Sequence, residues 1–396
     1  MSTASLRELA TAPSADPSSL SLRLAQGLVK PYTQPVAWIY WVDFLASIIG
    51  GHILFHLLLY HDRWLTGSNW WVGTVQVSLY AGVVLLYLRA VMFTHELVHL
   101  PKEGFRGFRF AWNLLCGIPF LVPSFTYYPH VDHHRRKSYG TEEDGEYLNL
   151  SHQPPSAIIV YMLLILVTPL AGFFRFAVLT PLSWLFPSMK RWTFRRASTM
   201  VMDIFYLRPD AGPKVQRIRF IQELACFGVC LFIALRNPLQ GKFYDPLWLQ
   251  AYLVGVGLLT LNNLRTLGAH RWTGDGSELS FQEQLLDSCD YPYRPWFTEL
   301  WGPVGTRYHA THHLFPTIPY HHLGKAHRAL MRGLPADSPF RQTVKVSLLR
   351  EIAELWWRAS QSQRRPVLAP ANGDSGSIPV QPVEKPQAAE DRKQVA

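Results

Sequence analysis

The sequence has few cysteines. Its N-terminus also lacks the basic segment, apolar segment and cleavage site that follow one another in a secretory signal. Only four cysteines occur among 396 residues, and they form no paired ligand motif. We therefore expect reduced cysteines that pack in apolar surroundings, without a disulfide framework. The first thirty or so residues are rich in Ser, Ala and Pro, which does not match a secretory signal.

The C-terminal segment lacks aromatic residues. From Gln361 onward the chain consists largely of Gln, Pro, Ser, Gly and charged residues. Such a segment cannot bury enough apolar surface to fold. We predict a mobile tail over residues 1–34, a membrane domain over 35–335, a C-terminal helical extension over 336–360 and a disordered tail over 361–396.

Histidines, by contrast, gather in three short clusters. These are His95-Glu96-Leu97-Val98-His99, His130-Val131-Asp132-His133-His134 and His309-Ala310-Thr311-His312-His313. On a helix, residues four apart share a face, so His95 and His99 can meet one ion. In each of the other clusters the adjacent histidines diverge enough to serve two ions. Neutral imidazole binds zinc, copper, iron and nickel, so the spacing indicates a polynuclear metal site.

The three clusters, in this order, resemble the histidine boxes of the membrane fatty acid desaturases. The resemblance covers roughly residues 35–335 and includes the stretches 113–120 and 314–320 beside the second and third boxes. It implies an all-α integral membrane protein with about four transmembrane helices in two hairpins. It also implies a cytoplasmic helical cap in which two iron ions (Fe²⁺), with O2 as co-substrate, remove two hydrogens from a lipid-linked acyl chain.

The resemblance also implies which residues hold the metal and form the catalytic centre. An additional histidine, His270, stands where such enzymes carry a further ligand. The implied ligands are His95, His99, His130, His133, His134, His270, His309, His312 and His313. The remaining histidines are expected in helix packing (His52 and His56) or as loop, surface or ligand-supporting residues (His61, His152, His321, His322 and His327).

Two acids inside the boxes are candidates for orienting the histidines. Metal-bound imidazoles usually donate their second N–H to a carboxylate or carbonyl, which Glu96 and Asp132 could accept; both could equally be solvated charges. The acidic run at 142–146 could play the same part or offset nearby basic residues. Asn263 precedes His270 by two helical turns and could hold a water on iron. Desaturases with such an Asn often place it four residues before the histidine, where this chain has Thr266.

Long apolar runs account for the 48% hydrophobic content. The runs at about 37–60 and 71–93 can each cross about 30 Å of hydrocarbon, and the short link between them predicts a hairpin. A second hairpin is expected from 218–235 and 247–267. Because boxes two and three must face the same compartment, the intervening run at 156–186 should not cross. We predict a surface or re-entrant helical pair there.

Basic residues indicate the orientation. Six lie between Lys102 and Lys137, whereas the loop at 61–70 contains only Arg63. The positive-inside rule therefore places the histidine boxes and both termini in the cytoplasm. The short apolar stretch at 111–122, broken by glycine and proline, is expected to be re-entrant or interfacial.

Other functions fit parts of the pattern. His95, Glu96 and His99 satisfy the zinc-metalloprotease signature, but that reading leaves most of the histidines unexplained. A non-enzymatic metal transporter predicts ligands at mid-membrane depth, whereas the clusters flank the spans. A related di-iron hydroxylase acting on a lipid, sphingolipid or carotenoid stays open, since both reactions begin by hydrogen abstraction and differ in the placement of the chain.

Electrons for this chemistry need a source outside the chain. No haem-binding Pro-Gly-Gly stretch occurs in the sequence. We expect a separate acidic ferredoxin or b-type cytochrome that is drawn to the basic cytoplasmic face. The other expected partners are the membrane and the lipid-linked acyl substrate, with no nucleic acid.

Overall fold

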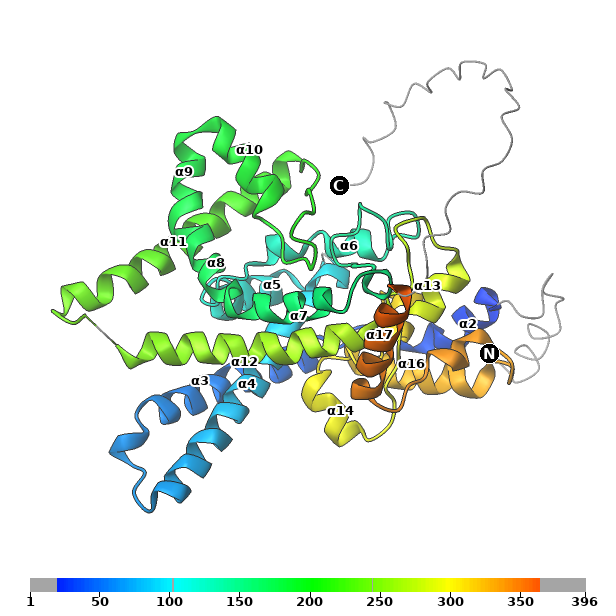
Figure 1. The fold of residues 1–396 in the computed structure, drawn as a ribbon, viewed down its shortest axis with the longest axis horizontal. Coiled ribbons are helices and arrows are strands. Elements are labelled where there is room, and N and C mark those ends of the chain that lie inside the picture. The colour runs from blue at the N-terminus through cyan, green and yellow to red at the C-terminus, as the bar shows by residue number, and fades with distance from the viewer. Residues whose placement is uncertain (1–19, 102, 244, 364–396) are drawn as a thin grey trace. The chain divides into compact units, whose positions relative to one another are not determined.

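The structure is a computed structural model that describes residues 20–101, 103–243 and 245–363. These residues form helices joined by loops, with isolated β-bridges and no strand (Figure 1). The helices are α2 Leu22–Val29, α3 Ala37–Leu59, α4 Asn69–His99, α5 Arg106–Trp112, α6 His130–His133, α7 Ser156–Leu163, α8 Thr168–Phe174, α9 Thr180–Leu185, α10 Pro187–Arg196, α11 Pro213–Leu239, α12 Pro246–Ala269, α13 Phe281–Asp287, α14 Pro295–Trp301, α15 His309–Leu314, α16 Tyr320–Gly333 and α17 Leu348–Ser362.

Short 3₁₀ and π turns connect or extend these helices. The 3₁₀ turns are Lys30–Tyr32, His61–Arg63, Ser124–Tyr127, Leu150–His152, Leu164–Leu166 and Pro339–Thr343, and the π-helical turns are Asn113–Gly117 and Arg175–Leu179.

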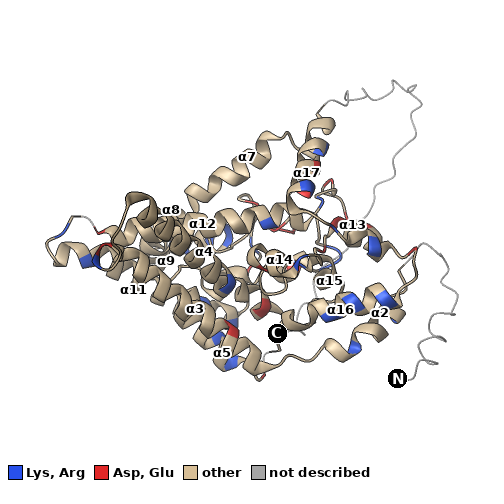
Figure 2. Cartoon of the chain, turned by 90° about the horizontal axis from the view of Figure 1, so that it is seen from below, with Lys and Arg blue, Asp and Glu red and all other residues tan. Residues whose placement is uncertain are grey.

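Four helices, α3, α4, α11 and α12, are long and apolar enough to cross a membrane. This confirms the prediction of an all-α membrane protein with about four spanning helices. Figure 2 shows few charges along α3, α4 and α12, whereas charged side chains recur along α16 and α17. α4 is longer than predicted and ends only at His99, because no helix-breaking residue comes before Pro101. The first histidine pair therefore lies on the last turn of a membrane helix.

The first hairpin packs through aromatic side chains. α3 and α4 lie side by side (Figure 1), and α5 closes one end of the pair. Tyr40 and Phe44 of α3 meet Phe93 of α4 and Phe108 of α5 with ring centroids 5.6–6.1 Å apart. The buried Trp112 indole donates to the Ala90 carbonyl at 2.8 Å. These contacts fix the end of α4 that carries His95.

The second hairpin is joined by the short turn between Leu239 and Pro246, as predicted. Its two helices pack against different neighbours: α12 lies along α4, and α11 contacts α9 and the Arg175–Leu179 turn. Asp245 caps α12 by accepting the Leu247 amide proton. α12 therefore positions His270, the residue directly after its last turn, near the end of α4.

The apolar run at 156–186 forms a bent pair of helices. The segments Ser156–Leu166 and Thr168–Leu185 meet at 53°, which is the geometry of a broken span or a re-entrant loop. Pro169 and Pro181 each begin a new helical segment in this region. The bend agrees with a helical pair, and that this pair does not cross the membrane stays a prediction.

The predicted N-terminal tail is wrong for residues 22–29. These residues form α2, which packs against α16 and buries Leu24, Ala25 and Val29. The apolar residues recur at helical spacing within a stretch whose flanks are rich in Ser, Ala and Pro, so composition alone misses the helix. Residues 1–19 of the predicted tail lie outside the described residues. Most of the predicted C-terminal tail does too, from residue 364 onward, while α17 extends to Ser362.

Single β-bridges connect the segments that follow the membrane helices. Asp290 pairs with both Tyr308 and Val344, and His270 pairs with Ser288. A capping box of Ser280 and Glu283 begins α13. These bridges bring the end of α12, the end of α13 and the beginning of α15 to one place.

Candidate metal centre

All nine predicted ligand histidines lie in two neighbouring groups. Within each group, every residue offers one ring nitrogen, and these nitrogens lie within 4.8 Å of one another. The five-histidine group consists of His95, His99, His130, His134 and His312, and the four-histidine group of His133, His270, His309 and His313. The groups adjoin, since the rings of His134 and His313 lie 4.4 Å apart.

Helix geometry explains how the boxes divide. Residues four apart share a helix face, so His130 stays with His134 and His309 with His313. The residue three after the first histidine points toward the opposite group. His133 thus joins the four-histidine group, and His312 joins the five-histidine group. Each of these two boxes therefore contributes to both groups, as the divergence of its adjacent histidines predicts.

Buried acids hold two histidines of the second box. The Nδ1 of His130 lies 2.9 Å from a Glu146 carboxylate oxygen, and the Nδ1 of His133 lies 2.8 Å from Asp144. Tyr127 stacks on the His130 ring with centroids 4.8 Å apart. Asp144 itself accepts backbone N–H groups, including that of Glu146 at 3.0 Å. The loop after α6 is thus folded around its own carboxylates.

His270 is held by a tyrosine and an acid. Its Nδ1 lies 2.8 Å from the Tyr139 hydroxyl, which donates to Asp287 at 2.7 Å. Asp287 is 1% exposed and also accepts from the Thr273 amide and hydroxyl. These bonds fix the imidazole although His270 lies in extended backbone beyond the end of α12.

Two buried residues outside the histidine groups, Asp290 and His327, support the third box. Asp290 is fully buried and accepts from the Thr311 amide and hydroxyl within α15. His327 of α16 lies 2.8 Å from the same carboxylate. This contact supports the third box, although His327 belongs to neither histidine group. It agrees with the ligand-supporting role that was one of those expected for His327.

The donor set fits metal ions. His133 and His270 both use Nδ1 for an oxygen acceptor, so in the neutral rings each Nε2 is an unprotonated acceptor. These two Nε2 atoms face one another at 3.3 Å. In the other group, both ring nitrogens of His95 and the Nε2 of His99 are buried without a hydrogen-bond partner. A cation in each group would bind the unprotonated ring nitrogens.

Burial keeps most of these rings neutral. It lowers the pKa of His130, His134, His309, His312 and His313 well below the ordinary value, and neighbouring histidines lower it further. Burial also raises the pKa of Glu146 to about 8. Burial opposes ionisation of Asp287, but hydrogen bonding and charge from His270 outweigh it and lower the Asp287 pKa. Neutral imidazoles present the lone pairs that a metal requires.

Three predicted site residues do not contact a histidine. Glu96 points away from the groups and accepts from the Tyr40 hydroxyl at 2.6 Å, because adjacent residues on a helix diverge by about 100°. Asp132 lies on the outer side of α6 and pairs with Arg135 at 2.6 Å. Asn263 meets the Tyr161 carbonyl at 3.5 Å. Of the two roles left open for Glu96 and Asp132, the orienting one is not seen in these contacts, and Asn263 bonds to a backbone carbonyl of α7.

The orienting groups come from elsewhere in the chain. Asp144 and Glu146 belong to the acidic run at 142–146, which could either orient histidines or offset nearby basic residues. Both contact histidines of the second box. Tyr139, Asp287 and Asp290 were not anticipated from the sequence. A sequence signal exists only for Asp287, which lies four residues after the Glu283 of a recognisable capping box and so closes a short helix.

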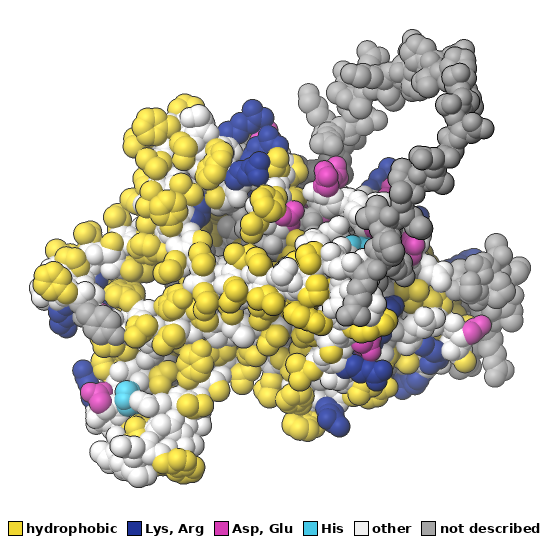
Figure 3. All heavy atoms as spheres, in the orientation of Figure 1, with side chains coloured by type: hydrophobic (Ala, Val, Ile, Leu, Met, Phe, Trp, Pro, Cys, Tyr) yellow, Lys and Arg dark blue, Asp and Glu magenta, His cyan; other side chains and the backbone are white. Residues whose placement is uncertain are grey.

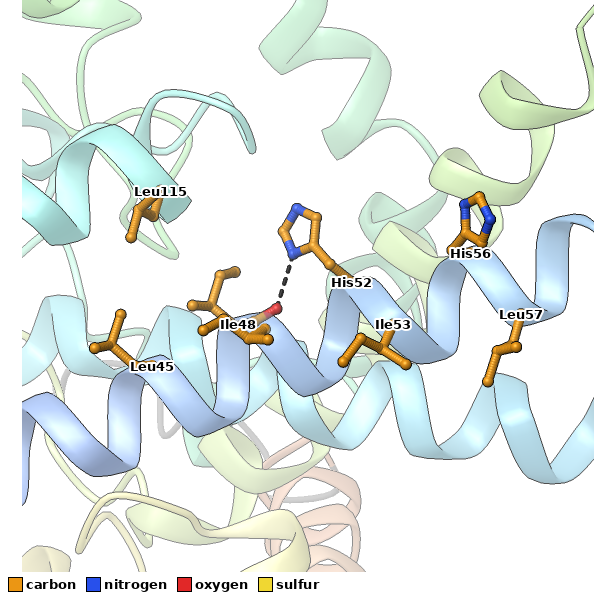
Figure 4. A pocket seen from close by; sticks show the side chains of 8 residues that line it. Leu45, Ile48, His52, Ile53, His56, Leu57 and Leu115 are labelled. Carbon is orange, nitrogen blue, oxygen red and sulfur yellow. Dashed lines mark hydrogen bonds between the residues drawn. The ribbon is translucent and has the colours of Figure 1, made fainter.

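The histidines of the first span lie apart from both groups. Figure 4 shows His52 and His56 beside an apolar cavity of about 550 Å³ lined by Leu45, Ile48, Leu57 and Leu115, among others. The His52 Nδ1 lies 2.8 Å from the Ile48 carbonyl, and its ring packs on Tyr87. His52 therefore serves helix packing, as expected, whereas the His56 ring lies 4.6 Å from that of Tyr60, one turn further along the chain.

Comparison with known proteins decides the family. A model of the fatty acid desaturase family matches residues 68–344. This chain belongs to the fatty acid desaturase family. Over 367 residues it is also 32% identical to a ceramide hydroxylase of Caulobacter vibrioides (strain NA1000 / CB15N), with 90% of this chain and 99% of the relative covered. No solved structure matches the chain.

The family and the site together weigh against the protease alternative. A zinc-protease glutamate acts as general base and must face the metal. Glu96 instead forms hydrogen bonds with the Tyr40 hydroxyl and the Tyr320 amide. The fatty acid desaturase family and the ceramide hydroxylase relative place this chain among membrane oxidoreductases that act on lipids.

Proposed function

We propose that this membrane protein is an O2-dependent lipid hydroxylase that holds two iron ions with its nine histidines and acts on a ceramide or a related sphingolipid. The observation that carries hydroxylation is the similarity to a ceramide hydroxylase along nearly the whole length of that relative. The observation that supports two metals is the division of the histidines into two neighbouring groups.

Neighbouring side chains orient the rings of the ligand histidines. A carboxyl oxygen of Glu146 and the carboxylate of Asp144 accept from Nδ1 of His130 and His133, which leaves each Nε2 free to face a metal. Tyr139 and Asp287 do the same for His270. Bound iron would supply the reductive activation of dioxygen, which none of these side chains can perform. Their task is to hold the rings, keep them neutral and limit the access of water.

The membrane helices suggest how a lipid meets the site. α4 is apolar along its length and ends in His95 and His99, so the five-histidine group lies at the end of a membrane helix. A lipid chain in the bilayer therefore has a short path to the site. We place the site on the cytoplasmic side, where the basic stretch from Arg106 to Lys137 favours it and where a ferredoxin or b-type cytochrome could deliver electrons.

Desaturation is the second candidate, because the matching family model describes fatty acid desaturases. Both reactions begin with the removal of one hydrogen from the chain. The outcome depends on whether oxygen is returned to that carbon or a second hydrogen is taken from its neighbour.

The test is a defined reaction. The purified chain would be reconstituted with a ferredoxin, its reductase and a ceramide under ¹⁸O2, and the lipid products would be analysed by mass spectrometry. We expect a ceramide that has gained one labelled oxygen atom. A product that has lost two hydrogens and contains no label would establish desaturation and overturn hydroxylation.

The controls separate chemistry from folding. A His312→Ala variant should yield neither product, because it removes a ligand from the five-histidine group. A His152→Ala variant should retain activity, since the exposed His152 imidazole bonds to the Thr273 carbonyl and belongs to neither histidine group. Turnover by His312→Ala at the level of the unmodified chain would contradict the assignment of the site.

A further inference from the structure

A second group of buried charges lies between the bent helical pair and α11, outside the histidine groups. Arg175, Arg208 and Arg219 are 4–6% exposed, and Glu223 is 1% exposed. Arg175 donates to one oxygen of Glu223, and the Arg219 Nε lies 3.5 Å from the other. Two buried guanidinium groups thus share one carboxylate, and a third, that of Arg208, lies over the same Phe194 ring as that of Arg219.

Arg208 has no acidic contact among the described residues. It donates to the Ser198 carbonyl at 2.6 Å, and its guanidinium lies over the rings of Phe125 and Phe194. The Nε of Arg219 has no hydrogen-bond partner. Buried charge is costly unless it is paired, so this excess of positive charge calls for an anion.

A cavity lies beside the unpaired charge. Its volume is about 440 Å³, which lies within the roughly 300–1,000 Å³ range of ligand sites. Its lining consists of Ser183, Trp184, Lys190, Gln216, Arg217, Arg219 and Phe220. Three of these residues are basic and none is acidic. Ser183 and Gln216 add neutral polar groups, so the lining suits an oxyanion.

The surroundings of the cavity are those of a membrane surface. Arg217 and Arg219 lie in the first two turns of α11, a candidate membrane span. Trp184, Phe186 and Phe220 are 36–52% exposed nearby. Figure 3 shows Lys and Arg side chains gathered beside hydrophobic ones over the α10 region. Tryptophan with basic residues is typical of the headgroup level of a bilayer.

We propose that this cavity binds the phosphate-bearing headgroup of an anionic membrane lipid. Lys190 and Arg217 would contact the phosphate from the open side, and Arg219 from the buried side. The acyl chains would lie along the exposed apolar side chains of α9 and α11. Basic pockets between membrane helices bind anionic headgroups in this way.

The bound lipid would stabilise a segment that leads to the histidine groups. Gln222, in the turn after Arg219, accepts from the Phe125 amide at 3.1 Å. Arg208 lies over the Phe125 ring, and Tyr127, two residues further, stacks on His130. Lipid binding is therefore expected to raise the melting temperature of the whole protein, with or without metal.

The test compares lipids on the full chain in a neutral detergent. Native mass spectrometry and thermal melting would follow the addition of phosphatidylglycerol, phosphatidylcholine or inorganic phosphate. The site variant is Lys190→Gln with Arg217→Gln. The control is Arg196→Gln with Lys214→Gln, which makes the same change in net charge on the same two helices at exposed positions outside the cavity.

We expect one tightly bound phosphatidylglycerol, which raises the melting temperature, and no such effect from phosphatidylcholine. The site variant should bind phosphatidylglycerol about thirtyfold more weakly, and the control should bind it normally. Equal loss in both variants, or normal binding in the site variant, would overturn the proposal. Stabilisation by inorganic phosphate as strong as that by the lipid would overturn the lipid as the occupant.

Discussion

The two histidine groups are built on different supports. The five-histidine group takes His95 and His99 from the end of α4, a helix of 31 residues that packs against α3 and α12. The four-histidine group takes nothing from a long helix: its ligands come from the four-residue α6, the six-residue α15 and the extended residue His270.

The acids compensate for this difference. Two ligands of the four-histidine group, His133 and His270, are fixed by the buried Asp144 and Asp287. In the five-histidine group, only His130 contacts a carboxylate, that of Glu146. Where a rigid helix positions a ligand, packing is sufficient. For His130 and His133 on the short α6 and for the extended His270, a hydrogen bond to an acid or to Tyr139 adds to the packing.

The largest expected effect comes from the residues that cross between the groups. His133→Ala should remove a ligand from the four-histidine group, and His312→Ala from the five-histidine group. Both should abolish lipid oxidation, because the two groups act as one centre. Lipid product per enzyme would be measured beside the exposed His152→Ala control. Activity in either crossing variant close to that of the control would separate the groups and contradict a shared centre.

A smaller effect is expected from the acid that supports His270. Asp287→Asn keeps the size of the side chain but removes the charge next to His270, and we expect metal affinity to fall about 10–100-fold. A chelator titration of the iron-loaded protein would measure it. Asp132→Asn is the control, since Asp132 pairs with Arg135 on the surface of α6. An equal change in both variants would show that Asp287 does not orient the ligand.

The hydrogen bond from Thr311 to Asp290, which supports the third box, should contribute to the stability of the protein. Thr311→Val removes the hydroxyl that donates to the buried Asp290. The free energy of unfolding should fall by about 1–3 kcal/mol, because the carboxylate loses a partner. Thermal melting of the detergent-solubilised protein would show the loss, with the Thr141→Val change at a partly buried local turn as a contrast. An unchanged melting temperature would mean that α15 does not depend on this anchor.

The smallest effect is expected from Tyr139→Phe. The change removes the hydroxyl between His270 and Asp287, yet the His270 Nδ1 already lies 3.4 Å from Asp287 and can bond to it directly. Metal affinity should therefore fall less than about tenfold. The same chelator titration applies. A loss as large as that in Asp287→Asn would make the tyrosine, rather than the acid, the group that holds His270.

The membrane helices and the histidine clusters could be predicted because both follow local patterns. Apolar runs longer than a bilayer is thick identify α3, α4, α11 and α12 without further knowledge. Spacing of three and four residues predicts that adjacent histidines diverge. His270 has no such local pattern, and it was found only through the resemblance to desaturases.

The supports of the ligands could not be predicted, because they depend on contacts distant in sequence. Asp287 reaches His270 only because α13 folds back on the end of α12. Glu96 lies beside two histidines in the sequence, yet helix geometry turns it toward Tyr40. α2 was missed for a related reason: its burial depends on α16, some 300 residues further on.

The measurement that most directly tests the account is the metal content of the detergent-purified protein. The two histidine groups predict about two irons per chain, and the His312→Ala variant should lose iron from the five-histidine group. A single zinc ion that survives the substitution would contradict the dinuclear centre.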